Sequence, residues 1–226
     1  MAKVKIAVVE SPNPIDLFDE RSESEGLVSA CKLIGHQSIS FFAKSRREFR
    51  EICLYLASAD TKHASKYPSA ALFLHLSCHG NKGGISFGSS KLLTWKALVQ
   101  DVKPILNNPY YQGNFALSIS SCGSGEHDMD EHILNKIEED DSIKIPQYIF
   151  SIPGCSVNWD DALIAWVLFY HKLSSIQLSD KIRIQAALKE IYKGTGLRFS
   201  YHRWDDQDKG YKTFTPKQLA DKRPHR

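Results

Sequence analysis

The sequence predicts a three-layer α/β fold, in which a mostly parallel six-stranded sheet carries helices on both faces. The main observation is that short apolar strand patterns alternate with amphipathic helical patterns along almost the whole chain. The composition agrees, because 226 residues with 42% hydrophobic and 24% charged side chains are typical of a globular protein. We expect one domain over residues 1–204, followed by a basic C-terminal tail over residues 205–226.

Six apolar runs have the length and composition of strands. The first is β-branched and ends at a loop that is rich in proline. The expected strands are residues 4–9, 37–42, 70–78, 114–121, 147–152 and 197–203, with a small hairpin over residues 85–93. Because helical patterns separate most of these strands, we expect a mostly parallel sheet.

Helices are expected where apolar residues recur with helical spacing after a start signal. Ser45 and Glu48 form a capping box, and Thr94 is a second N-cap. Asp160 or Asp161 is expected to cap a helix that is apolar nearly all round and is therefore buried. The expected helices begin near residues 27, 45, 94, 160 and 179.

Two segments carry an excess of one charge. Residues 123–145 hold eight acids and two lysines, whereas residues 198–226 hold eight bases and four acids. Both are interpreted as solvated surface, and the acids that interrupt the basic tail argue against a nucleic-acid partner. The acidic segment is expected to be an exposed, mobile loop or short helix. It lacks EF-hand spacing, so Ca²⁺ binding stays an alternative and no metal site is assigned.

The cysteines and the start of the chain predict a compartment. The chain has five cysteines, and its first ten residues hold only a four-residue apolar stretch. An odd number of cysteines without a secretory segment predicts reduced thiols and a cytoplasmic protein. The longest apolar run, residues 162–169, is far shorter than the ~20 residues of a membrane span, so no membrane association is expected.

Two consecutive expected strands end in residues that can carry chemistry. Cys78-His79-Gly80 follows one strand, and Ser121-Cys122-Gly123 follows the next. If the strands are neighbours, an imidazole and a thiol share the crevice at their carboxyl ends, as a cysteine nucleophile requires. Either residue alone is more often structural, and Cys78 is expected to point into the core. Cys155 is also interpreted as structural, and His75 as buried and hydrogen-bonded.

Together these motifs resemble the caspase-like cysteine peptidases, most closely the CHAT branch that is shared with separase. That family places His-Gly after one strand and a cysteine turn after the next, in the order found here. Within residues 150–173, the Asp-Asp-Ala and Phe-Tyr patterns resemble its next strand, turn and helix. The resemblance covers roughly residues 3–192, although Ser121 and Gly123 replace the neighbours of the strict caspase signature.

The resemblance implies a caspase-like three-layer sandwich and a cysteine endopeptidase with a Cys-His dyad. Cys122 would be the nucleophile and His79 its general base and acid, with the backbone N–H groups of Gly80 and Cys122 as the oxyanion hole. No cofactor is implied. The substrate would be a protein that receives limited cuts, and the acidic segment would gate the site or be cut itself. A regulatory protein partner and a role in bacterial defence or cell death are expected by analogy.

Two features of the expected substrate pocket point in opposite directions. The resemblance implies that Asp160, Asp161 and Ser156 lie along it, so that a carboxylate there would favour a basic P1 residue. Arg21 would instead favour an acidic P1 residue, and an apolar one stays open. Two other function classes remain as alternatives: a non-catalytic doubly wound binding or signalling domain, and another thiol-dependent hydrolase or transferase.

Overall fold

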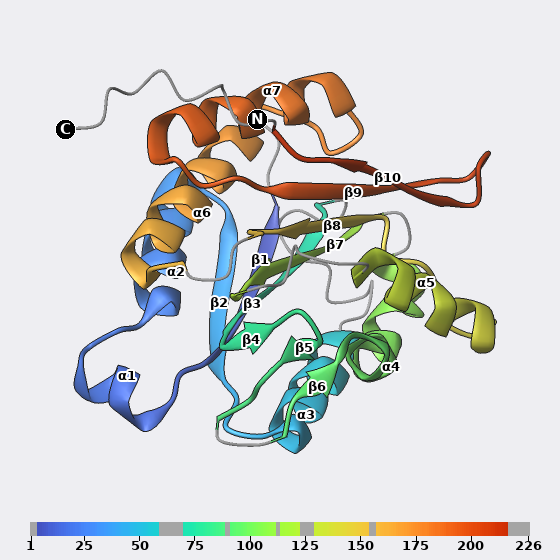
Figure 1. Cartoon of the computed structure of the whole chain (residues 1–226), viewed down its shortest axis with the longest axis horizontal. Helices are drawn as coiled ribbons and strands as arrows, with labels where there is room; N and C mark the ends of the chain where they lie inside the picture. The colour runs from blue at the N-terminus through green and yellow to red at the C-terminus, as the bar shows by residue number, and fades with distance from the viewer. Residues whose placement is uncertain are drawn as a thin grey trace.

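A seven-stranded mixed sheet forms the centre of the protein, with the strand order β10-β9-β8-β7-β3-β1-β2 (Figure 1). The structure, a computed structural model, describes residues 4–58, 70–88, 91–111, 114–122, 129–153 and 157–216. The strands are β1 (Lys5–Ser11), β2 (Gln37–Phe42), β3 (Leu72–Cys78), β7 (Phe115–Ser120), β8 (Tyr148–Ser151), β9 (Ser200–Asp205) and β10 (Gly210–Phe214). The strands from β2 to β8 in this order run parallel, whereas β9 is antiparallel to β8 and β10 to β9.

Helices cover both faces of this sheet, which confirms the expected α/β arrangement of three layers (Figure 1). One layer consists of α2 (Glu23–Ile34), α6 (Trp159–Leu173) and α7 (Lys181–Thr195). The other consists of α3 (Arg46–Ala57), α4 (Trp95–Leu106) and α5 (Met129–Glu139). The shorter helices of the described residues are α1 (Pro14–Phe18) and the 3-10 helix Pro109–Tyr111. No helix in this part of the chain is long and apolar enough to cross a membrane.

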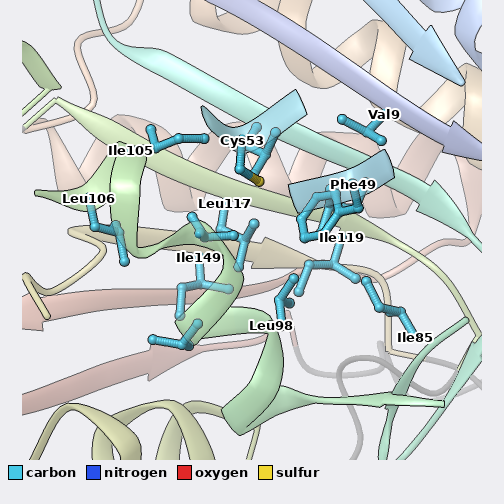
Figure 2. Packing of buried hydrophobic residues seen from close by; sticks show 14 of the residues in the cluster. Val9, Phe49, Cys53, Ile85, Leu98, Ile105, Leu106, Leu117, Ile119 and Ile149 are labelled. Atoms are coloured by element: carbon cyan, nitrogen blue, oxygen red, sulfur yellow. The ribbon is translucent and has the colours of Figure 1, made fainter. Parts of the chain in front are cut away.

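Side chains alternate across the sheet and thereby build two cores. Ala7 and Val9 of β1 join the core beneath α3, α4 and α5, whereas Ile6 and Val8 join the core beneath α2, α6 and α7. Figure 2 shows the first core, where Phe49 of α3 faces the strands together with side chains of α4. The central strands are buried on both faces, so their sequences are nearly continuous apolar runs.

The sheet extends beyond the domain boundary expected at residue 204. β9 ends at Asp205, and β10 lies within the segment that the sequence analysis placed in the tail. The rings of Trp204 and Tyr211 meet edge to face across this hairpin, with centroids 5.5 Å apart. The sheet therefore has one more strand than the six expected. The last strand was not predicted because a polar turn interrupts the alternating pattern of the hairpin in the sequence.

The described part of the acidic segment contains a helix, one of the two forms expected for it, but this helix packs against the core instead of being fully exposed. Residues 129–139 form α5, and its Met129, Ile133 and Ile137 are buried in the core shared with α3 and α4. Each of these three apolar residues is four positions from the next, so they form one apolar face of a helix whose other positions include the acidic residues. Lys103 of α4 also pairs with Asp140 at 2.9 Å. Residues 123–128 lie outside the described residues.

A small antiparallel sheet follows β3 directly. It consists of β4 (Gly80–Asn81), β5 (Gly84–Ile85) and β6 (Leu93–Thr94). Ile85 pairs with Leu93, which confirms the hairpin expected over residues 85–93. Gly84 has a φ of 154°, and a Cβ there would lie 2.0 Å from the carbonyl oxygen of Leu93, so this pairing requires glycine.

Candidate active site

His79 and Cys122 follow the carboxyl ends of two neighbouring parallel strands. β3 and β7 pair with Ser77 opposite Ser120, so the residues that follow both strands emerge at the same edge of the sheet. The structure brings both side chains to one cavity of about 90 Å³. The described residues that line it are Glu23, Cys78, His79, Ser120, Ser121, Cys122, Ile152, Val157, Trp159 and Ala162. No hydrogen bond joins Cys122 to His79 in the described part of the chain.

Close backbone packing holds the histidine turn against the cysteine turn. A Cβ on Gly80 would lie 2.9 Å from the Ser121 Oγ and 2.9 Å from the Gly84 carbonyl oxygen. Ser86 N–H also donates to the His79 carbonyl at 2.8 Å, which ties the turn to the small sheet. Glycine after the histidine therefore allows the two turns to touch. The assignment of the oxyanion hole to the backbone N–H groups of Gly80 and Cys122 stays a prediction.

The imidazole of His79 has three neighbours that were not predicted from the sequence. Its Nε2 lies 2.6 Å from the Asp16 Oδ2 and 3.1 Å from the Asn13 Nδ2. Its ring also meets the Trp159 ring edge to face, at a centroid distance of 5.8 Å. The His79 side chain is 45% exposed, whereas that of Asp16 is 5% exposed. A signal for Asp16 was present, since Asn13-Pro-Ile-Asp16 is a capping box that directly follows the carboxyl end of a strand.

The surroundings of Asp16 keep its carboxylate ionised. Burial works against ionisation, but hydrogen bonds from His79 and the Asn13 backbone, together with electrostatic interactions with His79 and Arg21, lower the pKa of Asp16 below its usual value. Arg21, an expected substrate contact, is 53% exposed and lies 3.1 Å from Asp19 and 4.0 Å from Asp16. It is not among the described residues that line the cavity.

The cysteines divide into one accessible thiol and three buried ones among the described residues. Cys122 is half-buried, whereas Cys31, Cys53 and Cys78 are buried in the cores. Burial raises the pKa of the Cys31 thiol to about 12, and it raises the pKa values of Cys53 and Cys78 as well. The expectation that Cys78 lies in the core is confirmed. Cys155 lies outside the described residues.

A buried carboxylate forms part of the cavity wall. Glu23, the first residue of α2, accepts hydrogen bonds from the hydroxyls of Ser77 and Ser120 at 2.8 Å each. Its other oxygen lies 2.9 Å from the Nε2 of His75, and the Nδ1 of His75 lies 3.0 Å from the Tyr170 hydroxyl. His75 is therefore buried and hydrogen-bonded, as expected. Serines inside otherwise apolar strands were the sequence signal for this network.

The start of α6 differs from the expectation. Its N-cap is Asn158, so neither Asp160 nor Asp161 caps the helix, and both aspartates are exposed. The Asn158 amide donates to Asp161 at 3.4 Å. Trp159 and Ala162 line the cavity from this segment, because helical geometry turns the side chains between them toward solvent. Ser156 lies outside the described residues.

The described residues include no group of three or more His, Cys, Asp or Glu side chains that can hold a metal ion. The arrangement instead offers a half-buried thiol, an imidazole whose Nε2 is already bound, and a carboxylate in the wall of a shared cavity. Comparison with models of known protein families finds no match for this chain, and comparison with curated proteins finds none either.

Proposed function

We propose that the protein is a caspase-like cysteine endopeptidase, related to the CHAT branch, in which Cys122 is the nucleophile and His79 its general base. The observation that carries this proposal is that Cys122 and His79 line one cavity at the carboxyl edge of the sheet. Ligand sites in parallel α/β sheets lie at this edge. The access of Cys122 to solvent supports the same assignment, because a nucleophilic thiol must be reached by substrate.

The acylation half of the proposed reaction uses two proton transfers at His79. The Nδ1 of His79 takes the proton of the Cys122 thiol, and the thiolate attacks the scissile carbonyl to form a tetrahedral intermediate. Backbone N–H groups of Gly80 and Cys122 stabilise its oxyanion. The imidazolium then protonates the leaving amine, and water hydrolyses the thioester that remains on Cys122. No cofactor is needed for these steps.

The proposed substrate is a protein segment with a basic P1 residue. Glu23 is the acid among the described residues that line the cavity, and because its oxygens are bound to His75, Ser77 and Ser120, it would favour a cationic side chain through its charge. Asp160 and Asp161 remain alternative acids, and Arg21 would favour the opposite charge. By analogy with the family, the protein would make limited cuts in the cytoplasm, under a regulatory protein partner, in bacterial defence or cell death.

A fluorogenic peptide library tests the proposal directly. We expect the wild type to cleave peptides, and Cys122→Ala and His79→Ala to abolish cleavage while the far-UV circular dichroism is unchanged. Cys31→Ala is the matched control, because that thiol is buried away from the cavity. Loss of cleavage in Cys155→Ala with full activity in Cys122→Ala would refute the assignment of the nucleophile.

The two other function classes give different results in the same experiment. A non-catalytic binding or signalling domain would cleave no peptide, and iodoacetamide would not alkylate Cys122 faster than a free thiol. Another thiol-dependent hydrolase or transferase would cleave no peptide, but its Cys122 would still react rapidly. Either result would overturn the peptidase proposal.

A further inference from the structure

We propose that Asp16 is a positioning residue that fixes the orientation and the tautomer of His79, which extends the Cys-His dyad to Cys122, His79 and Asp16. This inference rests on the peptidase function proposed above. Its geometric basis is the 2.6 Å distance between the Asp16 Oδ2 and the His79 Nε2, which joins residues far apart in sequence. The remaining contacts of the two side chains indicate what this interaction does.

The backbone around Asp16 holds its carboxylate in place. Asn13 is the N-cap of α1, and its side-chain Oδ1 accepts from the Asp16 N–H at 2.9 Å. The Asp16 Oδ2 in turn accepts from the Asn13 N–H at 3.0 Å. This capping box leaves the carboxylate buried, so it can orient a partner without losing much conformational freedom. The same Oδ2 accepts both the Asn13 N–H and the contact with His79.

The contacts at Nε2 determine which ring nitrogen carries the proton. An ionised carboxylate can only accept, so the 2.6 Å contact requires a hydrogen on Nε2. The Asn13 Oδ1 accepts from the Asp16 N–H, which fixes the amide so that its Nδ2 faces the ring at 3.1 Å. Because Nδ2 is a donor, this contact would favour the tautomer without a hydrogen on Nε2. The charge-assisted bond to Asp16 is the stronger of the two, so it prevails.

The Nε2–H tautomer leaves the Nδ1 lone pair of His79 for proton transfer. Nδ1 has no hydrogen-bond partner among the described residues, whereas Trp159 contacts the ring edge to face and limits its rotation. When Nδ1 takes the thiol proton, the imidazolium lies beside the Asp16 carboxylate and is stabilised by it. Asp16 therefore favours both the acceptor form of the ring before proton transfer and its charged form afterwards.

A structural role alone would make different predictions. If Asp16 served only to cap α1, its replacement would lower stability and leave the chemistry of His79 unchanged. Asp16→Asn preserves the size of the side chain and an acceptor for the Asn13 N–H. Asp19→Asn is the matched control, because Asp19 lies on the same turn, pairs with Arg21 and does not contact His79.

Three measurements test the inference. In the wild type, long-range ¹H–¹⁵N spectra of the neutral imidazole should show His79 as the Nε2–H tautomer, and Asp16→Asn should populate the Nδ1–H form. With the best library peptide, kcat/KM of Asp16→Asn should fall by about 100-fold, mostly in kcat, whereas Asp19→Asn should stay within about twofold of wild type. The pH at which Cys122 reaches half-maximal alkylation by iodoacetamide should rise in Asp16→Asn only.

Failure of this inference differs from failure of the proposed function. An Nδ1–H tautomer of His79 in the wild type would overturn the proposed role of Asp16. This measurement needs no variant, so the inference remains testable even if Asp16→Asn does not fold. If Asp16→Asn kept the cleavage rate, the His79 tautomer and the alkylation profile of the wild type, the role of Asp16 would also be overturned, while the peptidase proposal would stand. Absence of peptide cleavage by the wild type, with an Asp16-dependent tautomer and alkylation profile, would refute the peptidase and support the positioning role.

Discussion

Two histidine–carboxylate pairs involve β3, one in the middle of the strand and one directly after its carboxyl end, and they differ in exposure. His75 and Glu23 are 2.9 Å apart with side chains 0% and 1% exposed, whereas His79 and Asp16 are 2.6 Å apart and His79 is half-exposed. Both ring nitrogens of His75 have partners, Glu23 and the Tyr170 hydroxyl. His79 has partners at Nε2 alone among the described residues. A histidine with one bound and one free nitrogen can transfer protons, whereas a saturated one fixes structure.

The acids of the two pairs occupy different positions on the chain between β1 and α2. Asp16 belongs to α1, whose Ile15, Leu17 and Phe18 are exposed, so the cover over His79 is thin. Glu23 begins α2, and its backbone N–H donates to the buried Glu10 at 2.6 Å. The Glu23 pair is therefore integrated into the core, whereas the Asp16 pair lies at the rim of the cavity that His79 lines. The predictions below test whether this division between structure and catalysis holds.

The largest expected effect separates the two histidines by activity. His79→Ala should lower kcat/KM by about 1,000-fold or more, because the thiol loses its base. Cys122→Ala should have a similar effect, and the double variant should be no worse than either single one, since the two residues act as a unit. Steady-state kinetics with a cleaved peptide measure this. An additive loss in the double variant would show that the two residues do not work together.

The second effect separates the same histidines by stability. His75→Leu should lower the free energy of unfolding by about 3–5 kcal/mol, because Glu23 is left in the core without its main partner. His79→Ala, at a half-exposed site, should cost less than about 1 kcal/mol. Urea denaturation compares them. Equal losses in the two variants would remove the distinction between a structural and a catalytic pair.

A third effect tests whether Glu23 also has a role toward substrate. Glu23→Gln should lower cleavage after arginine, relative to cleavage after a neutral residue of similar size, by about 10-fold or more, because the negative charge in the cavity wall is lost. The ratio of the two kcat/KM values cancels any general loss of active protein. Asp160→Lys and Asp161→Lys are the competing variants, since those side chains are exposed. A change of the ratio in either of them, with none in Glu23→Gln, would assign P1 recognition to α6.

The order of elements and the ends of the strands could be predicted from the sequence, because local patterns determine them. The strand before His79 and the strand before Cys122 are nearly continuous apolar runs, and their parallel pairing brings the two residues to one edge. Gly80 was expected only as part of the oxyanion hole, and its close approach to Ser121 was not predicted.

The acids around the site could not be predicted in the same way, because their roles depend on tertiary contacts. Glu23 lies in a polar stretch with several other acids, and nothing local distinguishes it from Asp19 or Glu20. Asp16 had one local signal, its capping box with Asn13, which does not indicate the contact with His79. Asp160 was expected in the pocket from the resemblance, but the start of α6 at Trp159 turns it outward. A shift of one or two residues at a helix start thus decides which side chain faces a cavity.

The smallest expected effect concerns the pH dependence of the exposed pair. The pKa of Asp16 is lower in the folded protein than its ordinary value, against the effect of burial and chiefly through its hydrogen bonds with His79 and Asn13. A carboxyl with a lowered folded pKa stabilises the fold above its unfolded pKa of about 3.9, and this contribution is lost as the pH falls through the folded pKa. Wild type should therefore exceed Asp16→Asn in unfolding free energy near pH 6, by less than about 1 kcal/mol, and the difference should shrink toward pH 3. Urea denaturation of both proteins at several pH values measures it. A difference that is constant from pH 6 to pH 3 would mean that Asp16 acts through the shape of α1 rather than through its charge beside His79.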